Sequence, residues 1–146
     1  MAWGQELRRV HQRLRRALQV ARQEAADGDA GSASRELLLY CHGFCAALDG
    51  HHRGEDVLLF PAIAEAYPDL GPTLRRLEQD HSMIGHLLGS LQAAIARSAD
   101  SAELGRHLEG VAAIMESHFR YEERALAVVL EGLDLSADPT DVFGPL

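Results

Sequence analysis

Apolar residues recur at alternating steps of three and four through four long segments of the chain. This spacing is typical of helices that pack one face into a bundle. The pattern predicts helices over residues 5–26, 34–66, 72–96 and 102–130. Turn-forming residues between these segments indicate short loops. The fold class we expect is therefore all-α, an up-down-up-down four-helix bundle.

Each segment carries its apolar residues as one stripe. The stripe of the second helix is Leu37, Cys41, Phe44, Leu48, His51, Glu55, Leu58 and Ala62. The others are Leu7, His11, Leu14, Leu18 and Ala21; then Leu74, Leu77, His81, Ile84, Leu88, Leu91 and Ile95; then Leu104, Leu108, Val111, Met115, His118, Glu122, Ala125 and Val129. Proline has no amide hydrogen, so Pro61 should kink or end the second helix near Phe60.

Length and composition predict one helical domain. The 146 residues can bury a core, and 47% hydrophobic with 25% charged residues is ordinary for a globular protein. We assign residues 1–133 to the bundle. Residues 134–146 contain two prolines and three aspartates, which predicts an extended, weakly ordered tail, with Phe143 as the residue that would pack back.

The charge and the ends of the chain argue against several classes of function. A net charge of -8 is unfavourable for binding nucleic acid or an anionic membrane. The first residues contain no apolar signal core, and no apolar run approaches the ~20 residues of a membrane span. Cys41 and Cys45 do not make a disulfide framework, so a cytoplasmic location is expected.

Polar residues interrupt the stripes in a regular way. Every stripe contains one histidine, and His51 and His118 are each followed by a glutamate four residues later, one helical turn away on the same face. A buried carboxylate without a partner costs several kcal/mol, so each glutamate needs a partner charge. Imidazole and carboxylate groups aimed into a core suit a transition-metal ion.

The predicted loops bring these residues to one level. At ~1.5 Å per residue, His11 and His51 lie about 22 and about 25 Å from the first turn, and His81 and His118 about 24 and about 25 Å from the third. The candidate metal ligands are His11, His51, Glu55, His81, His118 and Glu122. Two bridging carboxylates and four terminal imidazoles suit a pair of iron ions, although zinc or manganese could use the same ligands. The alternative is a set of core histidines satisfied by hydrogen bonds.

Four segments of the sequence resemble the hemerythrin-like family, the HHE cation-binding domain. They are RRVHQRL, LDGHHRGEDVLLFPAI, LEQDHSMIGHLL and ESHFRYEERAL, and together they touch all four predicted helices. The resemblance implies a four-helix bundle with a non-haem di-iron centre and the same six ligands. It also implies that Glu55 and Glu122 bridge the two irons.

The chain departs from the oxygen-carrying members of that family at one position. Those proteins place a second histidine one turn after the third-helix histidine, where this chain has Gly85, and His86 points off the stripe. A site with six protein ligands leaves more room for a small molecule and favours redox reactivity over oxygen carriage. His52 is either a spare ligand or a boundary residue. Asp56 and Glu123 either lie behind the ligands, where Asp56 would orient a ligand histidine, or face solvent.

The predicted function is a redox reaction of dioxygen, peroxide or nitric oxide at the di-iron centre. Catalase-like removal of peroxide is one version, and a redox cycle needs an electron donor that the sequence does not identify. The alternative is a module that binds, stores or senses oxygen or iron without catalysis. A structural bundle with a vestigial site is a third reading, and it ranks lowest because all six positions are intact.

For most of the other polar residues the sequence predicts a surface, buried or packing position rather than a role in the site. His42, His86 and His107 lie off their stripes and are expected at the surface or its boundary, and Tyr121 is expected to pack. Cys41 and Cys45 are expected to be buried rather than a redox pair. The arginines of the first helix (Arg8, Arg9, Arg13, Arg15 and Arg16) are expected to form a solvated face. Gly50, Gly54, Gly85 and Gly89 indicate either close helix approach or a channel for a small ligand.

Overall fold

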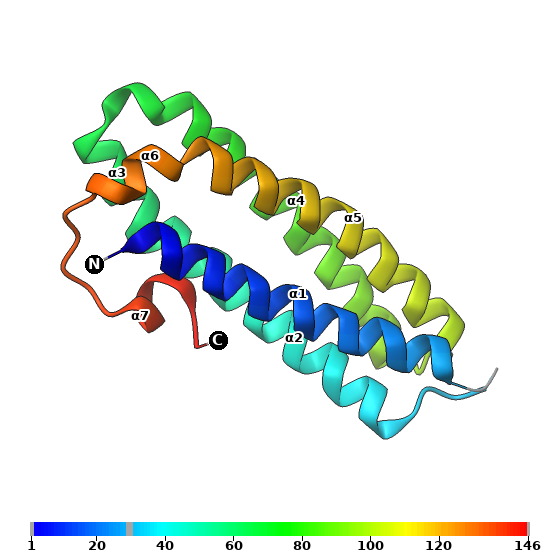
Figure 1. Cartoon of the computed structure of the whole chain (residues 1–146). Coiled ribbons are helices and arrows are strands. Elements are labelled where there is room, and N and C mark those ends of the chain that lie inside the picture. The colour runs from blue at the N-terminus through cyan, green and yellow to red at the C-terminus, as the bar shows by residue number, and fades with distance from the viewer. Residues whose placement is uncertain (1, 29–30, 146) are drawn as a thin grey trace.

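The computed structural model describes residues 2–28 and 31–145, which form helices joined by short loops (Figure 1). The helices are α1 (Trp3–Asp27), α2 (Arg35–Gly54), α3 (Phe60–Ala66), α4 (Gly71–Ala96), α5 (Ser101–Ala125), α6 (Ala127–Gly132) and α7 (Pro139–Phe143), with a π-helical turn η1 (Glu55–Leu59) and a 3-10 turn η2 (Pro68–Leu70). Within those residues there is no β-strand, and the only bridge of that kind joins Ser32 to Asp100. The all-α prediction is confirmed. Asp29 and Ala30 of the predicted first turn lie outside the described residues.

The four long helices surround a common core. Helix α1 packs against α2 and α5, and α4 packs against α5 and α2 (Figure 1). The stripes predicted for α1 and α4 are buried along their whole length. Side chains also start two of the helices, because Ser34 Oγ accepts a hydrogen bond from the amide of Leu37, and Asp100 accepts one from the amide of Glu103.

The second predicted helix is not continuous, and its stripe shifts by one residue. A π-helical turn begins at Glu55, so Leu59 and Ile63 are buried in place of the expected Leu58 and Ala62. A π-turn adds one residue to the helical turn and rotates all later side chains. Pro61 explains the position of this turn, because its ring and missing amide hydrogen disfavour an ordinary α-helical turn before it.

The fourth predicted helix is also interrupted. It ends at Ala125, and α6 continues after Leu126. Leu126 and Leu130 are buried, whereas the expected Ala125 and Val129 are only half-buried. The stripe prediction was therefore right as far as Glu122 and wrong beyond it.

The C-terminal segment is not extended throughout, which corrects the prediction for residues 134–146. Residues Pro139–Phe143 form α7, which lies beside α1, α2 and η1 (Figure 1). Phe143 packs back as expected, since it is fully buried and meets the Trp3 ring edge-on at 5.9 Å between ring centroids. The helix starts where Asp138 accepts a hydrogen bond from the amide of Thr140.

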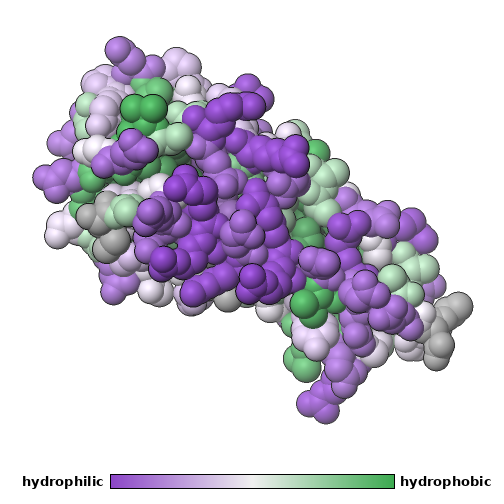
Figure 2. All heavy atoms as spheres, in the orientation of Figure 1, coloured by the Kyte–Doolittle hydropathy of each residue, from purple (hydrophilic) through white to green (hydrophobic). Residues whose placement is uncertain are grey.

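The surface is largely polar. Figure 2 shows hydrophilic residues over most of one face, with apolar residues in small separate groups. None of the helices in the described part of the chain combines the length and the apolar character needed to cross a membrane.

Candidate metal centre

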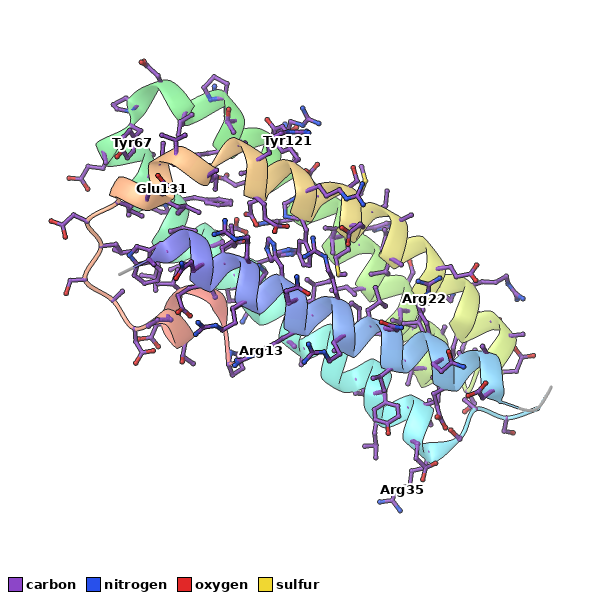
Figure 3. All side chains as sticks on the ribbon, viewed as in Figure 1. Arg13, Arg22, Arg35, Tyr67, Tyr121 and Glu131 are labelled. Atoms are coloured by element: carbon purple, nitrogen blue, oxygen red, sulfur yellow. The ribbon has the colours of Figure 1, made fainter. Side chains whose placement is uncertain are left out.

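The six residues predicted as ligands lie together in the middle of the core. They come from every long helix: His11 from α1, His51 from α2, Glu55 from the start of η1, His81 from α4, and His118 and Glu122 from α5. None is more than 6% exposed. Figure 3 shows polar side chains pointing into the interior between the helices, in the same region.

The residues form two groups whose donor atoms lie close enough to share a metal ion. One group is His11, His51, Glu55 and Glu122, and the other is His52, Glu55, His81 and His118. Within each group the donor atoms are all within 4.8 Å of one another. Glu55 belongs to both groups, whereas Glu122 belongs to one. His52 is 5% exposed and faces the second group, so its reading as a boundary residue is wrong.

The donor atoms converge in pairs. The Nε2 atoms of His11 and His51 are 3.1 Å apart, as are those of His81 and His118. Glu55 Oε1 lies between the pairs, 3.5 Å from His51 Nε2 and 3.3 Å from His81 Nε2. This carboxylate therefore lies between the two donor groups and belongs to both.

Several of these buried atoms have no hydrogen-bond partner. They are both carboxylate oxygens of Glu55, both of Glu122, Nε2 of His52 and Nδ1 of His11. Glu122 Oε1 lies 3.0 Å from His11 Nε2, close enough for charge attraction but not aligned as a hydrogen bond. Unpartnered buried carboxylates are costly. Cations at these two positions would supply the missing partners, so the residues present fit a metal.

The outward-facing nitrogens of three histidines of the site are hydrogen-bonded. His81 Nδ1 lies 2.8 Å from Asp56 Oδ1, His118 Nδ1 lies 3.1 Å from Asp80 Oδ2, and His51 Nδ1 donates to the Phe143 carbonyl at 3.1 Å. Such bonds fix the ring and leave Nε2 free to face a metal.

The fourth histidine, His11, has a looser outer partner. Its Nδ1 lies 3.3 Å from Glu123 Oε2. Arg15 holds that carboxylate at 2.9 Å and Glu116 at 2.8 Å. Arg15 therefore does not belong to a purely solvated face, which corrects the prediction for this arginine.

Three contacts were not foreseen from the sequence. Asp80 immediately precedes His81, and this adjacency was the available signal for it. Phe119 stacks on His11 with ring centroids 3.7 Å apart and planes 4° from parallel. His52 stacks on His81 at 3.9 Å and 13°. Asp56, which was expected either to orient a histidine of the site or to face solvent, hydrogen-bonds to His81.

Burial and neighbouring charges shift the pKa values of the site strongly. Burial, together with the charge of Glu55, raises the pKa of Glu122 to about 8. Burial opposes protonation of His81, but Asp56 and Glu55 outweigh it and raise that pKa to about 10. Burial and the charge of His81 lower the pKa of His118 to about 4. In the absence of a metal the site therefore holds a mixture of charged and neutral groups.

Two more histidines of the site stay neutral. Burial lowers the pKa of His51 well below its usual value, and so does the neighbouring His11. Burial does the same for His52, with His81 as the next cause. Neutral imidazole is the form that binds metal.

A pocket of about 340 Å³ opens onto the second group between α2 and α4. Its lining includes His52, His81 and Gly85. A Cβ at Gly85 would meet nothing within 4 Å, so there is open space at the position where the oxygen-carrying proteins would have a further histidine. Gly54 has the other explanation, close approach, because a Cβ there would lie 2.3 Å from the Val142 carbonyl oxygen.

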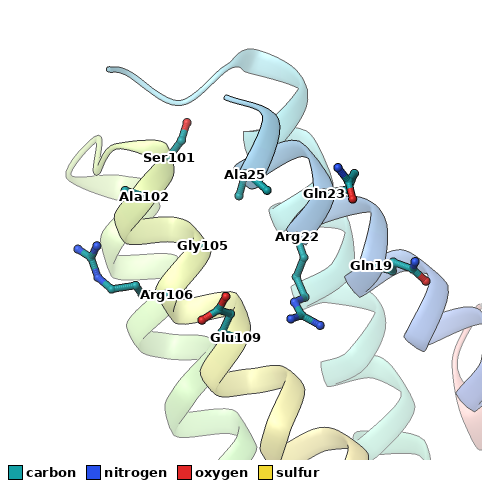
Figure 4. Close-up of a pocket in the computed structure, with 10 residues that line it drawn as sticks. Gln19, Arg22, Gln23, Ala25, Ser101, Ala102, Gly105, Arg106 and Glu109 are labelled. Atoms are coloured by element: carbon teal, nitrogen blue, oxygen red, sulfur yellow. The ribbon is translucent and has the colours of Figure 1, made fainter. Parts of the chain in front are cut away.

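Another pocket, of about 430 Å³, contains none of the site residues. It lies between α1 and α5 at the end where α1 finishes and α5 begins, with Ala25 and Ser101 in its wall (Figure 4). Its lining offers no histidine or cysteine, whereas the α2–α4 pocket is lined by His52 and His81 of the candidate metal centre.

The remaining polar residues behave largely as expected. His42 and His86 are exposed, and His107 is partly exposed beside Glu103. Tyr121 packs under the Arg76 guanidinium at 4.0 Å. Cys41 and Cys45 are buried free thiols, and burial raises their pKa values to about 11 and about 12. These raised pKa values disfavour the thiolate, which is the reactive form of cysteine.

A comparison with protein-family models agrees with this geometry. The model described as the hemerythrin HHE cation binding domain matches residues 5–130, from α1 into α6. The match includes every residue of both donor groups, and it ends before the C-terminal segment. Neither the curated proteins nor the solved structures yielded a match to this chain.

Proposed function

The chain belongs to the hemerythrin HHE cation-binding family, and from this premise we propose that its core holds a pair of non-haem iron ions. The observation that carries the proposal is the position of Glu55, which is shared by two groups of four imidazole and carboxylate donors. We also propose that α1, α2, α4 and α5 form the up-down four-helix bundle predicted from the sequence, which their pairwise packing supports.

The ligand assignment follows from the two groups. We propose His11, His51 and Glu122 for one ion, His52, His81 and His118 for the other, with Glu55 between them. Imidazole and carboxylate donors suit iron. Bound iron would supply one-electron redox steps and open coordination positions for a small molecule.

The protein residues then have distinct tasks. Asp56, Asp80 and the Phe143 carbonyl hold three imidazole rings so that each Nε2 faces inward. Phe119 covers His11 and excludes water from that side. His52 and His81 face the α2–α4 pocket, which gives a small molecule a route to the second group.

We propose dioxygen, peroxide or nitric oxide as the small molecule, in a redox reaction that also needs an external electron donor. The α2–α4 pocket supports this, because the open space at Gly85 lies beside two of the proposed ligands. The free thiols Cys41 and Cys45 agree with a reducing, cytoplasmic location.

A second candidate function is cation binding or storage, or sensing, without catalysis. The specific observation in its favour is His52, which completes a four-residue donor set around the second position. A fuller set of protein ligands leaves fewer coordination positions for an external molecule.

Metal analysis and absorption spectroscopy of aerobically purified protein test the proposal. We expect two irons per chain and a near-ultraviolet charge-transfer band that changes when peroxide is added. A band that peroxide leaves unchanged would favour binding or storage. The variant Glu55→Gln should lose iron, whereas Glu109→Gln, an exposed position on α5, should keep it. Failure of the wild type to bind Fe(II) would reject both functions.

A further inference from the structure

The outer partners of the ligand histidines follow a rule around the bundle. Asp56 follows the ligand Glu55 and contacts His81 on α4, and Asp80 precedes His81 and contacts His118 on α5. Glu123 follows the ligand Glu122 and faces His11 on α1. Each of these acids therefore neighbours a proposed ligand in the sequence and faces the outer nitrogen of a histidine on the next helix. Asp56 and Asp80 hydrogen-bond to that nitrogen, whereas Glu123 lies 3.3 Å from it without an aligned hydrogen bond.

The rule fails at one step, from α1 to α2. By position, the residue before His11 should orient His51, as Asp80 before His81 orients His118. That residue is Val10, which is apolar and buried, and the residue on the other side, Gln12, is exposed. Neither neighbour of His11 on α1 therefore provides an acid for Nδ1 of His51, whose Nε2 faces His11.

The C-terminal segment fills this gap. The Phe143 carbonyl accepts the hydrogen bond from His51 Nδ1 at 3.1 Å, where an acid would otherwise be expected. Phe143 also packs beside the His51 ring, with centroids 5.7 Å apart. Family resemblance does not account for this contact, because the matched region ends at residue 130.

Two glycines make this approach possible. Any side chain at Gly54 would collide with the backbone of α7, at 2.3 Å from the Val142 oxygen and 2.9 Å from the Asp141 oxygen. Gly144 has a positive φ of 87°, and a Cβ there would lie 3.0 Å from the His51 amide nitrogen. Both the helix and the C-terminal segment therefore carry a residue suited to close contact beside His51.

We propose that the C-terminal segment, residues 134–145, is a working part of the metal centre that positions His51 through the Phe143 carbonyl. The segment acts on one of the two proposed ion positions, because His51 belongs only to the group with His11 and Glu122. The inference rests on the proposed function for its effect on metal, but the positioning of the His51 ring is independent of it.

The variant Gly54→Ala tests the proposal without truncating the chain. The methyl group must displace the backbone of α7, so the Phe143 carbonyl should leave His51. Gly43→Ala is the matched control, since it adds the same methyl group to α2 at a position with nothing within 4 Å. The control also accounts for the higher helix propensity of alanine. Gly144→Ala perturbs the same contact from the segment itself.

The first readout is nuclear magnetic resonance of the metal-free protein. The wild type and Gly43→Ala should show a slowly exchanging Nδ1–H on His51. Gly54→Ala and Gly144→Ala should lose it while keeping their helical circular dichroism. Retention of this protected proton in both Gly54→Ala and Gly144→Ala would overturn the proposal.

The second readout is anaerobic titration with Fe(II). In Gly54→Ala the affinity of one ion should fall by about 10–100-fold, the usual effect of losing an outer partner of a ligand histidine. The other ion should bind as in the wild type. An equal loss of affinity for both ions would indicate that the variant disturbs the adjacent Glu55, which both groups share, and would overturn the proposal. A wild type that takes up no Fe(II) would refute the proposed function alone, since the protected proton still reports on the segment.

Discussion

Replacement of Glu122 by glutamine should stabilise the metal-free fold while weakening iron binding. Glu122 is fully buried, and its pKa rises from the usual 4.5 to about 8. At pH 7 the carboxyl is ionised in the unfolded chain and mostly protonated in the fold. Folding must therefore take up a proton, which costs about 3 kcal/mol at this pH. Glutamine has nearly the same shape and no such cost.

The sign of the pH dependence follows from the raised pKa. The cost is absent below about pH 4.5, grows as the pH rises and is complete above about pH 8. Part of the stability that the variant gains is offset, because glutamine loses the attraction between Glu122 Oε1 and His11, which lie 3.0 Å apart in the wild type. We therefore expect the variant to be about 1–3 kcal/mol more stable than the wild type at pH 8, and nearly equal to it at pH 4.5.

Urea unfolding of chelator-treated protein at several pH values measures this difference. The exposed Glu109→Gln on the same helix is the matched control and should show no such trend. With iron present the order should reverse, since only a protein that binds the ion tightly is stabilised by it. The reasoning is refuted if metal-free Glu122→Gln is less stable than the wild type at pH 8, or if the difference does not grow with pH.

Three further predictions address the second donor group. His52→Ala should lower the iron content from two ions per chain to one, and metal analysis that still finds two would remove His52 from the ligand set. Asp80→Asn should weaken one ion by about 10–100-fold in an Fe(II) competition titration, because it loosens the His118 ring. Gly85→Leu should slow the reaction with peroxide several-fold at unchanged iron content. Gly89→Leu is the control, because Gly89 also has open space but does not line the pocket, and it should react at the wild-type rate. Equal rates for the two variants would exclude the pocket as the route.

The sequence predicted the helical class and the gathering of the site because both depend on periodicity. Residues at one level of parallel or antiparallel helices meet whenever the helices are regular. Departures occurred where regularity ended: the π-turn at Glu55 moved the buried positions from Leu58 to Leu59, and the break after Ala125 moved them to Leu126. Pro61 signalled the first of these but not its π form.

The outer partners were harder to predict, because each lies on a different helix from the histidine that it orients. Asp56 could be suggested since it neighbours a ligand, and Asp80 carries the same signal. The Phe143 carbonyl carries no such signal, because every residue has a carbonyl. The evidence for its role comes from the fold, where a Cβ at Gly54 or Gly144 would collide with the backbone of the facing segment.

The irregular turns and the donor groups are related by position. Each glutamate of the site is followed by a departure from the α-helix: η1 begins at Glu55, and α5 ends three residues after Glu122. Proline accounts for the first but not the second, since residues 122–132 contain none. In both cases the glutamate and the acid after it face the two ring nitrogens of one histidine: Glu55 and Asp56 lie on either side of His81, and Glu122 and Glu123 on either side of His11. Local helical regularity gives way at the points where two successive carboxylates are both needed, which is where departures from sequence rules are expected in a functional core.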